Sequence, residues 1–324
     1  MTHLLVAGKL HPAGEALLAE LPSRGITVDY VEEVSEPSYA PLIHKADALV
    51  IRTQPLTAAT IAKAERLKVV SRHGVGYDSV DLEALNARNI GLTIVGDVNS
   101  ISVAEHAMMM ILAASKSVLR ADHAVRDPAQ WSWRNRMEAR EISGKRLLII
   151  GYGRIGQHIA RMAQGFDLNI NAYDPFLEAR GWPKGPVSAA ADLDEALAWA
   201  DIVTLNIPRG KEPLLNAERL AKMRPGSVLV NAARGGVVDE AALSEALRSG
   251  QIFAAGLDVF DDEPPGPDFP FAGQDNVVLS PHIAGLTDEC GQRMAISSIE
   301  NALTFLDGAI DPDLVVNRKT HDAR

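Results

Sequence analysis

The sequence has almost no cysteine: Cys290 is the only one among 324 residues. No internal disulfide can form, so we expect a reducing compartment such as the cytoplasm. Long hydrophobic runs are also missing. Because no stretch of about eighteen apolar residues occurs, we expect no membrane span. The apolar start, residues 1–8, lacks the basic residues of a signal peptide and is typical of a first strand.

Positive charge is scarce as well. The chain has 32 Lys and Arg against 42 Asp and Glu, so its net charge is 32 − 42 = −10. This excess of negative charge argues against nucleic acid or an anionic membrane surface as a partner, and we expect neither. Hydrophobic residues make up 47% of the chain and charged residues 23%, which is an ordinary globular balance. The length is sufficient for two domains.

Short apolar runs alternate with helical patterns in the first hundred residues, which is typical of a parallel sheet covered by helices. We expect strands over residues 4–7, 47–51, 68–70 and 92–95, and helices over 12–21, 38–45, 57–66 and 82–89. One long helix is expected over 100–119. Its run 108–112 is apolar on nearly every side, so we expect it to be buried between domains. The three methionines there are typical of core packing, and we expect no metal.

The alternation resumes after a polar segment, 127–141, that we interpret as a loop. We expect strands over 145–150, 169–173, 202–205, 227–231, 253–258 and 277–279, and helices over 157–164, 195–199, 217–223 and 240–249. A last helix, 288–306, is expected to return to the first domain. The sequence therefore predicts an α/β protein with two doubly wound parallel-sheet domains, one formed by residues 1–99 with 287–324 and the other by 100–286.

The most informative motif is Gly151-Tyr-Gly-Arg-Ile-Gly156, which lies between an expected strand and an expected helix. In that context G-x-G-x-x-G is a dinucleotide-binding fingerprint. Gly151 allows the tight turn, Gly153 lets a pyrophosphate approach the backbone, and Gly156 lets the helix pack against the strand. The phosphates would lie at the helix N-terminus, where backbone N–H groups have no partner within the helix.

Asp174 follows the next expected strand and comes 174 − 151 = 23 positions after the first glycine. This is close to the spacing of a carboxylate that binds the adenosine ribose. Its charge should repel a 2′-phosphate, and no arginine follows immediately. The sequence therefore predicts NAD as the cofactor in preference to NADP.

Three further residues place reactive groups at expected strand ends: Arg234, Glu263 and His282. Ligands bind at the carboxyl ends of strands in open α/β sheets. An arginine can bind a carboxylate through two hydrogen bonds, and a histidine can exchange a proton near neutral pH. Each residue alone is more typical of a turn or a solvated surface, but their order after the fingerprint predicts a catalytic set. A weaker motif, Gly74-Val-Gly76, is expected to offer backbone N–H groups to a small anion.

These residues carry a resemblance to the D-isomer-specific 2-hydroxyacid dehydrogenases, the family of D-3-phosphoglycerate dehydrogenase. It covers nearly the whole chain and resembles the short form without a regulatory domain. It implies a flavodoxin-like substrate domain, a Rossmann NAD-binding domain and a homodimer built through the latter. The segments that carry it are Arg72-His-Gly-Val-Gly-Tyr-Asp78, Val103-Ala-Glu-His106, the glycine fingerprint, Asn231-Ala-Ala-Arg-Gly-Gly-Val-Val-Asp-Glu240, Gly256-Leu-Asp-Val-Phe260 with Glu263-Pro264, and Pro281-His-Ile-Ala-Gly285.

The resemblance also implies residue roles. Arg234 would bind the carboxylate and carbonyl of a 2-oxo acid, His282 would exchange the proton with the reacting oxygen, and Glu263 would pair with His282. Asp258 would hold the nicotinamide amide. The substrate-binding residues would be Arg52, Arg72, Val75 and Gly76. The cofactor-binding residues would be Val75, Gly151, Gly153, Arg154, Ile155, Gly156, Asp174, Ile207, Ala232, Ala233, Asp258 and Gly285.

The identity of the substrate stays open. Arg52 and Arg72 match two basic positions that the phosphoglycerate enzymes use near the phosphate. Alternatively, Arg52 only supports binding of the substrate carboxylate and Arg72 is a surface charge. Three departures argue against phosphoglycerate and serine feedback: Arg52-Thr-Gln-Pro-Leu56 lacks a lysine that is common there, Asn206-Ile207 replaces the usual His or Thr before Pro208, and no regulatory extension is expected after Arg324.

Several functions remain to be compared. The leading hypothesis is an NAD-dependent oxidoreductase that interconverts a small 2-hydroxy acid and a 2-oxo acid, with a second anionic group on the substrate. The first alternative is a glyoxylate or hydroxypyruvate reductase. The second is an NAD(H)-sensing, corepressor-like binding protein, against which the presence of Arg234, Glu263 and His282 argues. A formate dehydrogenase is disfavoured because those enzymes typically have Gln where Glu263 stands.

Overall fold

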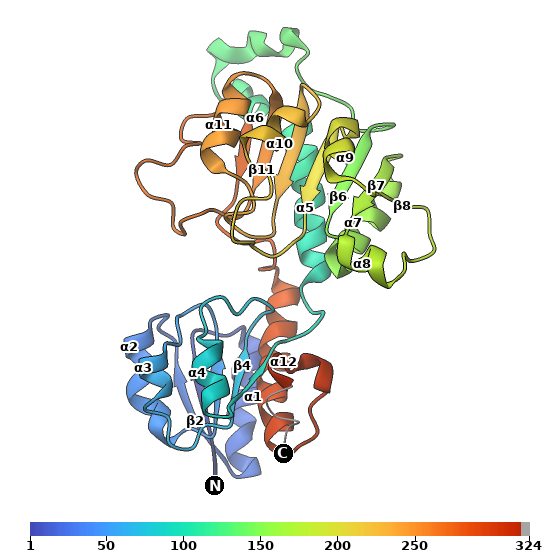
Figure 1. Ribbon diagram of the computed structural model, residues 1–324. Helices are drawn as coiled ribbons and strands as arrows, with labels where there is room; N and C mark the ends of the chain where they lie inside the picture. Colours follow the sequence, from blue (N-terminus) through green and yellow to red (C-terminus); the bar gives the residue numbers. More distant parts are fainter. Residues whose placement is uncertain (319–324) are drawn as a thin grey trace. The chain divides into compact units, whose positions relative to one another are not determined.

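The chain divides into two compact units, each with its own sheet (Figure 1). The computed structural model describes residues 1–318. The first unit comprises Met1–Asn99 together with the chain from Leu286 onward, and the second comprises Ser100–Gly285. The first unit thus resumes at Leu286, one residue before the expected boundary at 287.

The first unit is built around a five-stranded sheet in which every neighbouring pair of strands is parallel. The strand order, β2-β1-β3-β4-β5, is the flavodoxin-like order, so this part of the predicted fold is confirmed. The strands are β1 (Thr2–Ala7), β2 (Ile26–Val31), β3 (Ala48–Ile51), β4 (Val69–Arg72) and β5 (Gly91–Thr93). Strand β2 was not predicted, because this edge strand is only partly buried and lacks a continuous apolar run.

Helices cover both faces of this sheet. Successive residues of one strand point to opposite faces, so Leu49 and Val70 belong to one core whereas Val50 and Val69 belong to the other. The long C-terminal helix α12 packs against α1, β3 and β4. The helices are α1 (Pro12–Glu20), α2 (Glu36–Tyr39), α3 (Ala58–Ile61), α4 (Leu82–Ala87) and α12 (Asp288–Leu306), with short 3-10 helices at Leu21–Arg24, Ala40–Lys45 and Pro312–Leu314.

Two helices of this unit are shorter than predicted. The pattern over 38–45 is an α-turn followed by a 3-10 helix that contains Pro41, which has no N–H to donate. The pattern over 57–66 ends as an α-helix at Ile61. Here the guanidinium of Arg88 donates hydrogen bonds to the carbonyl oxygens of Ile61 and Ala64, which a longer helix would use itself.

The second unit has a seven-stranded parallel sheet of order β12-β11-β10-β9-β6-β7-β8. The chain proceeds outward from β6 to β8, crosses to β9, and proceeds outward again to β12. The direction therefore reverses between β6 and β9, as in a doubly wound Rossmann fold, which confirms the second predicted domain type. The strands are β6 (Arg146–Ile150), β7 (Asn169–Tyr173), β8 (Ser188–Ala189), β9 (Ile202–Leu205), β10 (Ser227–Asn231), β11 (Ile252–Leu257) and β12 (Val277–Leu279).

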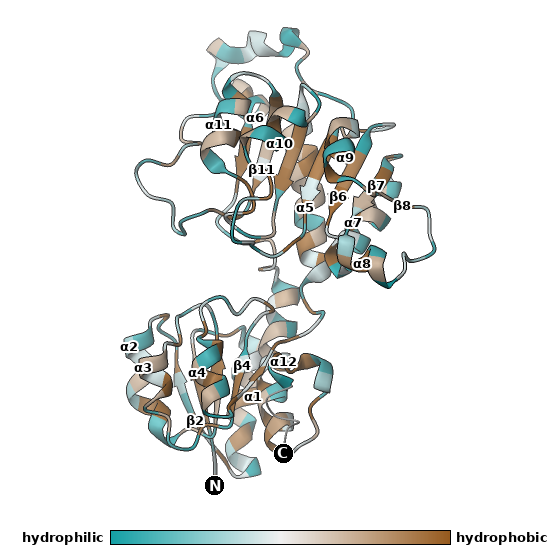
Figure 2. Cartoon of the chain, viewed as in Figure 1, coloured by the Kyte–Doolittle hydropathy of each residue, from teal (hydrophilic) through white to brown (hydrophobic). Residues whose placement is uncertain are grey.

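The two faces of this sheet bury different helices. Helices α5 and α7 pack in one core and α9, α10 and α11 in the other, and Figure 2 shows hydrophobic strands between them. The helices are α5 (Ser100–Ser115), α6 (Val118–Arg126), α7 (Arg154–Gln164), α8 (Pro175–Arg180), α9 (Leu193–Trp199), α10 (Ala217–Lys222) and α11 (Glu240–Arg248).

The helix expected over 100–119 is wrong in length. Helix α5 ends at Ser115, and the left-handed conformation of Ser117 (φ 52°) separates it from α6. Met108 and Met110 are buried in the core of the second unit, whereas Met109 is 42% exposed, so the methionine run is not buried on every side. The polar segment 127–141 is only partly a loop, because Pro128–Arg136 forms 3-10 helix. In residues 1–318 no helix has the length and hydrophobicity to span a bilayer.

Candidate active site and cofactor-binding edge

The glycine fingerprint forms the turn between β6 and α7. Gly151 has φ 90°, and a Cβ there would lie 2.5 Å from the carbonyl oxygen of Asn206. A Cβ at Gly156 would lie 2.3 Å from the carbonyl oxygen of Gly151. At Gly153, in contrast, no atom lies within 4 Å of the Cβ position. The three glycines thus serve the turn, the close packing of α7 and an open approach to the backbone, which is the division of roles that a bound pyrophosphate requires.

The N-terminus of α7 borders that open approach. Its N-cap, Gly153, has no side chain to occupy the N–H groups of the first turn, which begins with Arg154 and Ile155. Asp174 lies at the end of β7 beside this turn. One carboxylate oxygen accepts a hydrogen bond from the backbone N–H of Tyr152 (3.0 Å), and the other caps α8 at Leu177 (3.0 Å). The sheet therefore places a fixed carboxylate next to the glycine turn.

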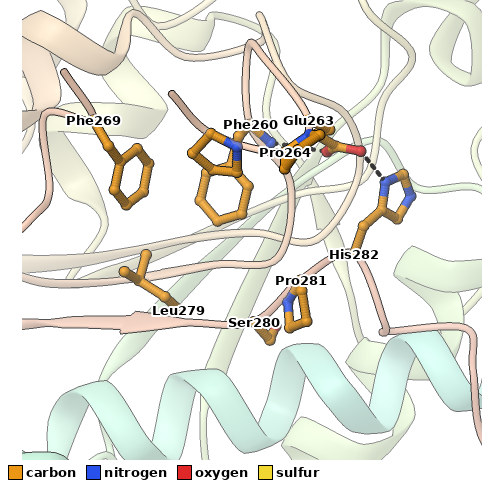
Figure 3. Close-up of a pocket in the computed structure, with 9 residues that line it drawn as sticks. Phe260, Glu263, Pro264, Phe269, Leu279, Ser280, Pro281 and His282 are labelled. Carbon is orange, nitrogen blue, oxygen red and sulfur yellow. Dashed lines mark hydrogen bonds and ion pairs between the residues drawn. The ribbon is translucent and has the colours of Figure 1, made fainter. Parts of the chain in front are cut away.

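His282 and Glu263 form an ion pair, with 2.6 Å between imidazole Nδ1 and carboxylate Oε2 (Figure 3). The other carboxylate oxygen, Oε1, accepts a hydrogen bond from the backbone N–H of Phe260 (3.0 Å), which holds the carboxylate in place. A carboxylate can only accept, so Nδ1 carries the proton in this contact. The remaining ring nitrogen, Nε2, is free of Glu263 and is the atom that can exchange a proton with a ligand.

An apolar pocket of about 430 Å³ lies beside this ion pair. Glu263 and His282 contribute to its lining, and Figure 3 shows Phe269 at the other end. The remaining lining residues are Phe260, Pro264, Pro265, Leu279, Ser280 and Pro281. The side chains of His282 and Glu263 are themselves 50% and 35% exposed, so the pair lies between this pocket and solvent.

The loop that carries His282 is folded around a buried carboxylate, Asp258. Its oxygens accept hydrogen bonds from the backbone N–H groups of Ile283 (2.9 Å) and Ala284 (2.8 Å) and from the hydroxyl of Ser280 (2.5 Å). His282 itself has φ 54°, and its N–H donates to the carbonyl oxygen of Asp258 (2.8 Å). Asp258 is therefore a positioning residue for the imidazole. The contact with the nicotinamide amide that the resemblance implies for Asp258 would be additional to these hydrogen bonds.

His106 extends this network from helix α5. Its Nε2 lies 2.9 Å from the hydroxyl oxygen of Ser280. Because that hydroxyl donates its only proton to Asp258, Nε2 of His106 must be the donor toward Ser280. From the sequence, His106 stands out only as part of a motif, and no role is expected for Ser280. The two residues are 174 positions apart, so no local pattern could have linked them.

Arg234 is presented by a turn that Asn231 organises. The side-chain amide of Asn231 donates to the carbonyl oxygen of Arg234 (2.9 Å), and its oxygen accepts from the N–H of Ala233 (3.1 Å). Gly235 then packs so closely on the next loop that a Cβ would lie 1.8 Å from the carbonyl oxygen of Phe260. The turn that carries Arg234 and the loop that leads to Glu263 are therefore in direct contact. The sequence placed Asn231 in a motif but did not reveal that its side chain organises this turn.

The remaining residues expected in the second unit lie on the same edge of its sheet. Ile155, Ala232 and Ala284 form a small apolar cluster with Val103. A Cβ at Gly151 would lie 2.8 Å from the side chain of Ile207. The ends of β6, β7, β9, β10, β11 and β12 thus supply every site residue that the sequence analysis expected in this unit, as parallel topology dictates.

Arg52, Arg72, Val75 and Gly76 belong to the first unit, at the carboxyl ends of β3 and β4. The guanidinium of Arg52 donates to the carbonyl oxygen of Lys9 (2.5 Å), and burial lowers the pKa of Arg52. Buried His73 directly follows Arg72, and its pKa is lowered to about 3 by burial and then by the guanidinium of Arg52. This edge therefore carries two arginines and a neutral imidazole.

Comparison with known proteins places these features in a family. Residues 108–284 match the family model described as "D-isomer specific 2-hydroxyacid dehydrogenase, NAD binding domain". A D-3-phosphoglycerate dehydrogenase of Archaeoglobus fulgidus is 36% identical over 300 residues, which are 92% of this chain and 56% of that protein. A glyoxylate reductase of Korarchaeum cryptofilum is 35% identical over 91% of this chain and 93% of its own length.

The structure also resembles solved structures over nearly its whole length. The TT0316 protein of Thermus thermophilus superimposes with a TM-score of 0.87 at 32% identity, covering 97% of this chain and 100% of that one. The chain spans only 56% of the length of the Archaeoglobus relative.

Proposed function

We propose, since this chain belongs to the D-isomer specific 2-hydroxyacid dehydrogenase family, that it interconverts a small 2-hydroxy acid and the corresponding 2-oxo acid by hydride transfer. The observation that carries the proposal is the His282–Glu263 pair at the carboxyl edge of the second sheet, next to the turn of Arg234. We assign the second unit to NAD binding and the first unit to substrate binding.

The family model that matches this chain is an NAD-binding domain, and the matched residues 108–284 lie within the second unit. The open space at Gly153 and the uncapped first turn of α7 fit a pyrophosphate, which the N–H groups of Arg154 and Ile155 would bind. Asp174 would bind the adenosine ribose. We further assign Val75, Ile207, Ala232, Ala233, Asp258 and Gly285 to contacts with the nicotinamide half.

Asp174 should decide between NAD and NADP. We expect Asp174→Ser to weaken NADH binding about tenfold, the value of one charge-assisted hydrogen bond, and to raise the ratio of NADPH to NADH activity. Serine can still cap α8, so the helix stays intact. Asp192→Ser is the matched control, because Asp192 caps α9 in the same way and is assigned no cofactor contact. Titration of both variants with NADH and NADPH measures the effect, and equal losses in both would contradict the assignment.

The residues of this chain divide the chemistry among them. When bound, NADH supplies the hydride that reaches the carbonyl carbon of the 2-oxo acid. His282 delivers a proton from Nε2 to the carbonyl oxygen, so that the C=O bond becomes CH–OH. Glu263, which accepts the hydrogen bond from Nδ1, orients the ring and stabilises the imidazolium before the transfer. In the oxidative direction the neutral imidazole removes the hydroxyl proton.

Binding and orientation are the tasks of the other residues. Arg234 would bind the substrate carboxylate through its planar guanidinium, next to the carbonyl to be reduced. The N–H groups of Val75 and Gly76 would donate to the same carboxylate. Arg52 would supply the positive charge that contacts a second anionic group of the substrate, and Arg72, on the opposite face of the sheet, would add positive charge to the same edge without contacting that group.

A substrate panel tests this assignment. NADH consumption at 340 nm should be at least about tenfold more efficient with a doubly anionic 2-oxo acid than with glyoxylate, because glyoxylate has no second group for Arg52 to bind. The panel comprises oxaloacetate, sulfopyruvate, 3-phosphohydroxypyruvate, hydroxypyruvate and glyoxylate, with NADPH as the cofactor control. Arg72→Ala should reduce activity only with the doubly anionic acids.

Other outcomes would support other functions. A flat profile that favours glyoxylate or hydroxypyruvate would support the reductase alternative, which the match to the Korarchaeum glyoxylate reductase favours. Tight NADH binding without turnover of any 2-oxo acid would reject the enzyme and support an NAD(H)-sensing protein.

We also propose that the protein is a homodimer of the cytoplasm. Helix α6 and the 3-10 helix after it expose several large apolar side chains, which is typical of a surface that a partner covers. These are Val118, Leu119, Val125, Trp131 and Met137. The single, buried Cys290 fits a reducing compartment.

A further inference from the structure

Gln54 is an unusual residue at the carboxyl edge of the first sheet. Its side chain is only 2% exposed, yet in residues 1–318 neither its amide nitrogen nor its amide oxygen has a hydrogen-bond partner. Burying an amide without a partner is unfavourable, and such groups in native proteins usually meet a ligand or water. Gln54 follows the end of β3 by three residues and Arg52 by two. The buried, unpartnered amide of Gln54 therefore points to a polar ligand that binds at this edge of the sheet.

The side chains of Gln54 and Arg52 both lie close to the backbone of Gly8. A Cβ built at Gly8 would be 3.1 Å from Nε2 of Gln54 and 3.1 Å from Cδ of Arg52. Gly8 directly follows β1 and has φ 96°, so the ends of β1 and β3 meet at this point. The missing side chain of Gly8 leaves both polar groups adjacent.

Arg52 carries a charge that no acidic residue of the described chain balances. Within residues 1–318 no carboxylate lies within 4.0 Å of its guanidinium, whose hydrogen bond goes to the carbonyl oxygen of Lys9. A guanidinium does not lose its proton at neutral pH, although burial lowers the pKa of Arg52. A partly buried cation of this kind calls for an anionic ligand.

Arg72 is oriented differently. The register pairs Arg72 with Ile51, so Arg52, the next residue after Ile51, points to the opposite face of the sheet. The Nη1 atom of Arg72 donates to the carbonyl oxygen of His73 (2.7 Å) and lies 3.3 Å from the Cβ position of Gly74. Arg72 thus folds along its own strand. His73 is neutral, because its pKa is about 3.

We propose that Gln54 is a specificity-determining residue that binds the distal group of the substrate together with Arg52, and that this group is a singly charged oxyanion, a carboxylate or a sulfonate. The inference rests on the proposed function, since it names the substrate class of the same site. Arg52 supplies one positive charge and Gln54 a neutral N–H donor. A phosphate monoester carries between one and two negative charges at neutral pH, more than this pair neutralises.

Exchange of Gln54 for leucine tests the proposal, because leucine keeps much of the volume and removes both polar atoms. We expect Gln54→Leu to lower kcat/KM for oxaloacetate and sulfopyruvate by roughly tenfold to a hundredfold, chiefly through KM, and for glyoxylate by less than about threefold. Gln54→Glu should be worse, because its carboxylate repels the distal group. Thr53→Ala, at the exposed neighbouring position, should change the activity neither with the doubly anionic acids nor with glyoxylate. The unchanged protein should use 3-phosphohydroxypyruvate about tenfold less efficiently than the better of the two acids.

Equal losses on glyoxylate and oxaloacetate, or a preference for 3-phosphohydroxypyruvate, would overturn the inference and leave the proposed function standing. No turnover of any 2-oxo acid by the unchanged protein would instead reject the proposed function. Calorimetric titration with malonate gives a readout that does not depend on turnover: Gln54→Leu should weaken malonate binding, and unchanged affinity would contradict the inference. Gln54→Asn, which keeps the amide, should be intermediate and guards against misfolding of the leucine variant.

Discussion

His282→Asn is expected to lower kcat roughly a thousandfold, within the range that general acid–base catalysis contributes. The imidazole is the group whose Nε2 can deliver a proton to the substrate, and asparagine cannot replace it. Asparagine tolerates the left-handed backbone conformation that His282 adopts, so the loop around Asp258 should keep its shape. Steady-state kinetics with the best 2-oxo acid of the panel measures kcat, and titration of protein fluorescence measures NADH binding.

The binding measurement separates chemistry from structure. NADH affinity should stay within about threefold of the unchanged protein, because His282 lies on the loop after β12 and not in the glycine turn. Glu263→Gln should show a smaller loss, since glutamine can still accept from the imidazole but does not stabilise its positive charge. His123→Asn, on helix α6, is the control. A His282→Asn variant with normal kcat would remove the main support for the proposed mechanism.

Gly156→Ala is expected to produce the second large effect, a loss of NADH affinity of at least about tenfold together with a destabilisation of about 1–3 kcal/mol. The added methyl group would lie 2.3 Å from the backbone carbonyl oxygen of Gly151 and 3.1 Å from Cγ2 of Ile149, which leaves it no room. Helix α7 must therefore move away from the turn that would bind the pyrophosphate. Chemical denaturation measures the free energy of unfolding, and fluorescence titration measures NADH affinity.

Alanine substitutions at two other glycines serve as comparisons for Gly156→Ala. Gly153→Ala should weaken NADH binding with little change in the free energy of unfolding, because its Cβ position is open. Gly266→Ala, also in open space, should change neither quantity. If Gly153→Ala and Gly156→Ala lowered stability equally, the separate roles assigned to the two glycines would be incorrect.

The sequence predicted those parts of the fold that depend on local patterns. Strands buried in a parallel sheet are continuous apolar runs, and most of them were found to within two residues. The edge strand β2 was missed because Thr27 and Asp29 interrupt its apolar residues. The predicted ends of α3 and α5 were wrong for different reasons. Arg88, which is distant in the sequence, donates a hydrogen bond to the carbonyl oxygen of Ile61 at the end of α3. After α5, the left-handed conformation of Ser117 turns the chain.

In the candidate site, too, the features that depend on local patterns were predicted and those that depend on distant residues were not. Arg234, Glu263 and His282 could be found from the sequence because each follows a strand, and parallel strands end at one edge. Their supports could not be found in this way. Asp258 holds the His282 loop through Ser280, and His106 reaches that serine from another helix. Gln54 could not be predicted either, because only the structure shows that its amide is buried without a partner in the described part of the chain.

By itself, the sequence determined the class of fold, the dinucleotide fingerprint and the identity of the residues proposed for catalysis. These depend on the spacing of glycines, apolar runs and polar residues over short stretches of chain. Only the tertiary structure decided which atoms face one another. It showed that Nδ1 of His282 is bound to Glu263, and that Arg52 and Arg72 lie on opposite faces of their sheet. The physical reason is that hydrogen-bond direction, burial and strand register arise from contacts between residues distant in the chain.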